Sequence, residues 1–136
     1  MTLISICIPA FNRVELLPEL LDSILVQDYF DYEIIVAEDD SPQRSAISAT
    51  IAGYIRCHGE KIKYYENPRN LGYDGNLRKL IELANGCYIL FMGNDDLLAA
   101  GALASIADVL HKYSETGVIL RSYSSFVSDP ERPVQV

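Results

Sequence analysis

The sequence predicts an α/β fold, a three-layer sandwich built on a mainly parallel sheet. Short apolar runs rich in β-branched residues alternate with longer segments in which apolar residues recur at helical spacing. Strands that alternate with helices along a chain favour parallel pairing with right-handed crossovers. The chain has 136 residues, which is the size of one ordinary domain with a core of its own.

The first strand and helix follow directly from this pattern. Residues 3–8 form a β-branched run, and Pro9 should end its hydrogen bonding because proline has no amide hydrogen. Residues 14–27 predict a helix in which leucine and isoleucine make one wide apolar face. Pro18 lies in about its first turn, where a missing amide hydrogen is tolerated.

The next elements repeat the alternation. Residues 33–37 predict a second strand, and residues 61–65 a shorter third one. Between them, residues 45–57 predict a helix whose isoleucines recur every four residues. Residues 67–72 are rich in Asn, Pro and Gly, which predicts a loop.

The second half predicts two more helices and two more strands. A helix begins at Asp74 or Gly75 and ends at Asn85-Gly86. Residues 88–92 are apolar throughout, so we expect a central strand. Apolar residues at helical spacing over 103–110 predict a further helix, and residues 117–120 predict the start of another strand.

Composition narrows the class of protein. The net charge of -8 argues against nucleic-acid binding, because the surface would repel phosphates. The three cysteines fit neither a disulfide framework nor a zinc site, and Cys7 and Cys87 are expected in the core of a protein from a reducing compartment, the cytoplasm. We expect residues 1–125 to form the domain and residues 126–136 a loop or frayed tail.

Two of the predicted strands run into clusters of carboxylates. Asp95 and Asp96 follow the strand at 88–92, and ligands bind at the carboxyl ends of strands in open α/β sheets. A bound Mg²⁺ or Mn²⁺ would relieve the repulsion between two adjacent carboxylates. The alternative is that Asp96 is a helix N-cap.

The other cluster, at residues 38–41, follows the second strand. Asp39 could accept hydrogen bonds from a base or a ribose, although Asp, Ser and Pro together are also typical of a plain turn. The loop after the first strand, Pro9-Ala10-Phe11-Asn12-Arg13, places an aromatic ring where it could contact a flat base, but a Phe after a strand is more often part of the core.

In order and spacing, residues 3–120 resemble the family 2 glycosyltransferases, whose nucleotide-sugar-binding fold is called GT-A. The motifs that carry the resemblance are Ile4 to Arg13 (the opening strand and a Pro-x-Tyr-Asn-Arg loop, with Phe for Tyr), Leu20 to Val36, Glu38-Asp39-Asp40-Ser41 (for Asp-Asp-Gly-Ser), Asn70-Leu71-Gly72 with Asn76, and Gly86 to Asp96.

The resemblance implies that the chain is the donor-binding part of an inverting transferase, which moves a sugar from a nucleoside-diphosphate sugar to a hydroxyl acceptor. Asp39 would bind the base and Pro9 to Phe11 would wall it. Asp95 and Asp96 would end a DXD-type motif, with Asp96 the direct ligand of Mn²⁺ or Mg²⁺ and Asp95 nearer the ribose. The motifs are most similar to members that build bacterial surface polysaccharides.

The residues assigned to donor binding are thus Pro9, Ala10, Phe11, Asn12, Arg13, Asp39, Asn76 and Asp95, with Asp96 and Asp95 for the metal. The sequence departs from the family pattern at Glu38, at Gly93, where the family has Asp, and at Gly75, where many members have Arg. We find no candidate for the catalytic base, so the sequence predicts the truncated donor-binding half of a longer enzyme that is inactive when isolated.

Three alternatives remain at this point. The first is a nucleotide-sugar-binding module without transferase activity. The second is a receiver-like signalling domain, which would need an acidic pair after the first strand, where this chain has Pro9-Ala10-Phe11. The third is a dinucleotide-binding oxidoreductase, which would need a Gly-x-Gly-x-x-Gly motif there. The sequence is also compatible with peripheral membrane association of the full-length protein and with a homodimer.

Overall fold

The structure is a computed structural model that describes residues 3–127 and 129–131. Four parallel strands form one sheet in the order β3-β2-β1-β4. Along the chain the elements are β1 (Ile4–Ala10), α1 (Leu17–Leu25), β2 (Tyr32–Glu38), α2 (Arg44–His58), the 3-10 helix η1 (Gly59–Lys61), β3 (Ile62–Glu66), α3 (Gly72–Leu83), β4 (Tyr88–Phe91) and α4 (Ala102–Lys112).

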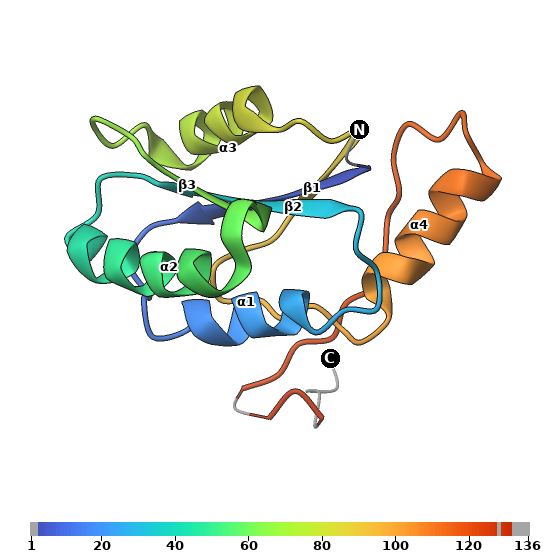
Figure 1. Cartoon of the computed structure of the whole chain (residues 1–136), viewed down its shortest axis with the longest axis horizontal. Helices are drawn as coiled ribbons and strands as arrows, with labels where there is room; N and C mark the ends of the chain where they lie inside the picture. The colour runs from blue at the N-terminus through green and yellow to red at the C-terminus, as the bar shows by residue number, and fades with distance from the viewer. Residues whose placement is uncertain (1–2, 128, 132–136) are drawn as a thin grey trace.

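The helices lie on both faces of the sheet, which confirms the predicted three-layer α/β fold. Figure 1 shows α3 on one face and α1 and α2 on the other, with α4 to the right of the sheet. Residues alternate between the two faces along a strand. Ile6 and Ile34 therefore belong to the core under α1 and α2, whereas Cys7 and Ile35 pack with Leu80 of α3.

The helices form where predicted, with ends shifted by a few residues. Residues 14–27 predicted the first helix, but α1 begins at Leu17 because residues 14–16 form a turn closed by the hydrogen bond from Leu16 N to Arg13 O at 3.1 Å. Within the described ranges, no helix is long and apolar enough to span a lipid bilayer.

The prediction that Pro9 ends the pairing of β1 is wrong. Pro9 and Ala10 continue the register with β2, opposite Ala37 and Glu38. The Cys7 carbonyl accepts from Met92 N, so the backbone of Cys7 faces β4. The backbone of Pro9, two residues on, faces the same side, but β4 has already ended at Phe91. Proline is tolerated because its missing amide hydrogen faces no partner there.

The strand at 88–92 is not central. β4 pairs only with β1 among the described strands, and Ile89 and Phe91 are 36% and 42% exposed because α3 lies over β1 and β2. Cys87, just before this edge strand, is exposed rather than in the core. An apolar run therefore marked a strand correctly, but not its place in the sheet.

The expected strand at 117–120 does not form in the described part of the chain. Val118 and Leu120 are 78% and 92% exposed, and no neighbouring strand pairs with them. A β-prone run becomes a strand only where a partner satisfies its backbone. Of the predicted tail, residues 128 and 132–136 lie outside the described residues, and the 1–125 boundary stays a prediction.

Candidate functional site

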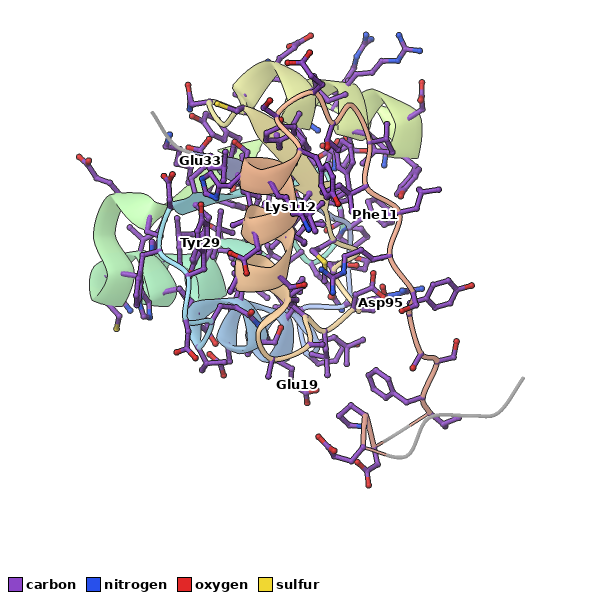
Figure 2. The ribbon with its side chains drawn as sticks, turned by 90° about the vertical axis from the view of Figure 1, so that its right-hand side faces the viewer. Phe11, Glu19, Tyr29, Glu33, Asp95 and Lys112 are labelled. Atoms are coloured by element: carbon purple, nitrogen blue, oxygen red, sulfur yellow. The ribbon has the colours of Figure 1, made fainter. Side chains whose placement is uncertain are left out.

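A cavity of about 850 Å³ opens at the carboxyl ends of the strands. It gathers residues from the loops after β1, β2 and β4 and from the start of α3. The predicted binding residues that line it are Pro9, Phe11, Asn12, Arg13, Asp39, Asn76, Asp95 and Asp96. Figure 2 shows Phe11 and Asp95 toward the same side of the molecule, with Glu33 on the other side.

Ala10 is the one predicted binding residue that does not line this cavity. Its side chain is fully buried in the core, and its carbonyl accepts the Asp39 N–H at 3.0 Å. Its side chain points into the core because β1 extends as far as Ala10, and alternate residues of a strand face opposite sides.

The loop after β1 has an unusual backbone. Asn12 and Arg13 have φ of 55° and 57°, in the left-handed region that non-glycine residues seldom occupy. Two side chains hold this shape: Asn94 Nδ2 donates to the Asn12 carbonyl at 3.0 Å, and Gln43 Oε1 accepts the Val14 N–H at 3.0 Å. Strained backbone that neighbours hold in place clusters at functional sites.

Asp95 and Asp96 lie on a tight turn directly after β4. Asp96 N donates to Gly93 O at 3.1 Å, and Gly93 N donates to Asp96 Oδ2 at 3.0 Å. Asp95 forms an ion pair with Arg13 across the cavity. The acidic pair therefore belongs to the cavity wall, and Asp96 does not cap α4, which begins at Ala102.

The two carboxylates converge over Gly93. A Cβ built on Gly93 would lie 2.8 Å from Asp96 Oδ2 and 3.1 Å from Asp95 Oδ1. Oxygens of both carboxylates thus lie beside Gly93, and hard cations prefer oxygen ligands. No group of three or more His, Cys, Asp or Glu residues that could hold a metal occurs in the described ranges. The remaining ligands of a cation here would come from water or from the phosphates of a bound molecule, as is common for Mg²⁺.

Asp39 closes the opposite part of the cavity and holds the loop that precedes α3. Its Oδ1 accepts hydrogen bonds from Leu71 N at 2.8 Å and from Asn67 Nδ2 at 2.9 Å. Asn67 also donates to Asn76 Oδ1 at 2.9 Å, and Asn76 Nδ2 donates to the Ala37 carbonyl at 2.9 Å. Asp39 and Asn76 thus shape the cavity through buried hydrogen bonds, in addition to lining it.

Glu38 has a different task from Asp39. Its fully buried carboxylate accepts from Ser41 N at 2.7 Å and from Arg44 Nε at 2.5 Å. Burial raises the pKa of Glu38, but these hydrogen bonds outweigh it and leave the pKa below its usual value. Glu38 therefore fixes the turn that presents Asp39.

The structure also shows site residues that sequence reasoning missed. Asn94 and Gln43 hold the loop after β1, and Asn67 links Asp39 to Asn76. Tyr73 and Asn70 also line the cavity. The signals in the sequence were the loop that begins at Asn67, which is rich in Asn, Pro and Gly, and the Asn70-Leu71-Gly72 motif.

Comparison with known proteins identifies the family. The sequence matches the family model described as "Glycosyl transferase family 2" over residues 5–135. The chain belongs to this family. It is 36% identical over 113 residues to the abequosyltransferase RfbV of Salmonella typhimurium, which covers 83% of this chain and 34% of that protein.

A second relative is the GalNAc(5)-diNAcBac-PP-undecaprenol beta-1,3-glucosyltransferase of Campylobacter jejuni. It is 34% identical over 104 residues, 76% of this chain and 33% of that protein. This family 2 chain therefore spans about a third of the length of these two relatives.

Two solved structures share the fold. S. aureus TarS 1-349 superposes with a TM-score of 0.73 at 23% identity, over 82% of this chain and 33% of that one. The mannosyltransferase PcManGT from Pyrobaculum calidifontis, in complex with GDP-Man and Mn²⁺, gives a TM-score of 0.71 at 22% identity, over 79% of this chain and 32% of that one. The GT-A type of fold expected from the sequence is thus confirmed.

Proposed function

We propose that this chain binds the nucleoside-diphosphate sugar of an inverting glycosyltransferase that acts in bacterial surface polysaccharide synthesis. The observation that supports it most is the meeting of Phe11, Asp39 and the acidic pair Asp95-Asp96 in one cavity at the carboxyl ends of the strands. The named relatives are sugar transferases, and PcManGT was solved with GDP-Man and Mn²⁺.

Each part of the cavity has a role in this proposal. Phe11 and Pro9 wall the base, and Asp39 hydrogen-bonds it. Asp96 and Asp95, whose oxygens lie beside Gly93, would hold Mn²⁺ or Mg²⁺. The cation would offset the negative charge that grows on the leaving diphosphate.

In this proposal the chain binds the donor, and no described residue is assigned to the acceptor site or to the role of catalytic base. Asp39, Asp95 and Asp96 are the acidic residues that line the cavity among those described, and all three already have other roles. A general base must reach the attacking hydroxyl. We therefore expect the isolated chain to bind donor without transferring sugar, as a binding module would.

A thermal-shift screen tests the proposal. UDP, GDP, CDP and dTDP are each added with and without Mn²⁺, and at least one should raise the melting temperature more with the metal. Asp96→Ala should abolish the metal-dependent part, whereas Asp108→Ala, an exposed aspartate on α4, should keep it. If no nucleotide gives a metal-dependent shift in the wild type, the proposal is wrong.

The remaining expectations about the cellular setting are proposals too. The cysteines of the described chain are free thiols, which suits the reducing cytoplasm. Peripheral membrane association and a homodimer stay predictions.

A further inference from the structure

The ion pair between Arg13 and Asp95 joins residues 82 positions apart in the sequence. Both side chains line the cavity, and they are 56% and 42% exposed. Asp96 has no cationic partner among the described residues. Arg13 therefore neutralises the carboxylate of Asp95, whereas that of Asp96 keeps its charge without a cationic partner among the described residues.

The loop backbone is fixed on both sides of Arg13, but its side chain is held loosely. The Asn12 carbonyl is bonded by Asn94, and the Val14 N–H by Gln43. Among the residues that the structure describes, the guanidinium of Arg13 is held only by its exposed ion pair with Asp95. Such pairs change the equilibrium between the formed and the broken contact by about two- to fivefold. The side chain of Arg13 can therefore leave Asp95 without any rearrangement of the loop.

We propose, on the basis of the proposed function, that Arg13 masks Asp95 until a nucleoside diphosphate enters the cavity. Arg13 then leaves Asp95 for the diphosphate, since guanidinium groups bind phosphate oxygens well. Asp95 becomes available to the divalent cation in the same step. Arg13 is thus a positioning residue that makes metal and nucleotide bind cooperatively, and this coupling must be the same in either order of binding.

Titration of Mn²⁺ tests this inference. Calorimetry measures the affinity for Mn²⁺ alone and for Mn²⁺ with the nucleoside diphosphate that gives the largest thermal shift, at about 0.15 M salt, where charge effects are screened beyond about 8 Å. Arg13→Gln should bind Mn²⁺ alone about two- to fivefold more tightly than the wild type. It should bind the diphosphate without metal more weakly, so that the cooperativity falls.

Arg69→Gln is the matched control. Arg69 is exposed in the neighbouring loop, and it makes no ion pair with the residues that the structure describes, so its loss removes the same charge without the contact. It should leave the affinity for Mn²⁺ alone unchanged within the error of the measurement, because charges without a direct contact are screened at this salt concentration. An equal gain in Arg69→Gln would overturn the inference.

A second measurement follows Arg13 in the wild-type protein, so no charge is removed from the cavity. Nitrogen NMR follows the Arg13 guanidinium resonance of the wild type, assigned by its absence in Arg13→Lys. It should shift when the metal-free diphosphate is added. An unchanged resonance, or an unchanged affinity of Arg13→Gln for Mn²⁺ alone, overturns the inference even if the wild type binds nucleotide with metal. Absence of any metal-dependent nucleotide binding in the wild type would instead refute the proposed function.

Discussion

Gly93 lies beneath the acidic pair, where the lack of a side chain lets the two carboxylates approach each other. A Cβ at this position would lie 2.8 Å from Asp96 Oδ2, so the Asp96 carboxylate would have to move. In the family pattern that this sequence resembles, Asp stands at the position of Gly93. In this arrangement, any side chain at position 93 would have to displace the end of the Asp96 side chain.

Gly93→Ala should displace the Asp96 carboxylate and break its hydrogen bond from the residue 93 N–H. We expect the metal-dependent part of nucleotide binding to fall by at least about tenfold, because ligand geometry sets the affinity for a small hard cation. Titration of the nucleotide with and without Mn²⁺ measures this. Gly117→Ala is the control, since a Cβ at Gly117 meets no atom within 4 Å; equal behaviour of the two variants would contradict the account.

For single residues, the sequence predicts which residue types follow each strand, but it does not predict which side chains contact each other. Asp39, Asp95 and Asp96 were expected at one sheet edge because parallel strands end there, and they do line one cavity. The pair between Arg13 and Asp95 was not predicted, since nothing local relates residues 82 positions apart. Side-chain contacts of this kind depend on the finished fold.

The connection from β2 to α2 is the element that positions Asp39. Glu38 ends β2, and its carboxylate accepts from Asp40 N, Ser41 N and Arg44 Nε. Arg44 Nη2 also donates to the Asn67 carbonyl at 2.5 Å, which joins this turn to the loop before α3. Loss of Glu38 would leave several donors without a partner.

Glu38→Ala should lower the free energy of unfolding by about 3 kcal/mol, as expected when one partner of a buried ion pair is removed. Urea denaturation measures this. Asp74→Ala, which removes an ion pair with Arg78 whose side chains are 83% and 76% exposed, should cost less than about 1 kcal/mol. Similar losses in the two variants would show that Glu38 is not the anchor of this turn.

Secondary structure followed from the sequence where local pattern and final environment agree. β1, β2 and the four helices were predicted because buried faces impose periodic apolar residues. The pattern could not show that β4 is an edge strand or that residues 117–120 lack a partner strand. An apolar run looks the same in the sequence whether its segment becomes a central strand, an edge strand or no strand. Pro9 stays within β1 for the same reason: its effect depends on whether a neighbour faces it.

At the scale of the whole molecule, Glu33 of β2 links its strand to β1 and β3 near the amino ends of the strands, at the opposite end from the cavity. Its carboxylate accepts from Ser5 Oγ at 2.6 Å in β1, from Lys63 Nζ at 2.6 Å in β3, and from Asn85 N at 2.8 Å before β4. Burial alone would raise the pKa of Glu33, but these hydrogen bonds lower it to about 2 from an ordinary 4.5.

This lowered pKa makes folding dependent on pH. A carboxylate whose pKa is lower in the folded state stabilises the fold above its unfolded pKa, and that stability is lost as the pH falls from about 4.5 toward 2. We expect Glu33 to contribute on the order of 3 kcal/mol to this loss. Urea denaturation of wild type and Glu33→Gln across this range should give a shallower pH dependence for the variant; parallel curves would contradict it.

The central claim is that Asp95 and Asp96 hold a divalent cation against the diphosphate of a nucleotide in the cavity at the strand ends. Crystals grown with Mn²⁺ and the nucleoside diphosphate selected by thermal shift test it most directly, through the anomalous scattering of manganese. We predict one manganese peak in contact with at least one of these carboxylates and with the diphosphate, and the base beside Phe11. A nucleotide bound elsewhere, or a manganese peak away from both carboxylates, would contradict the account.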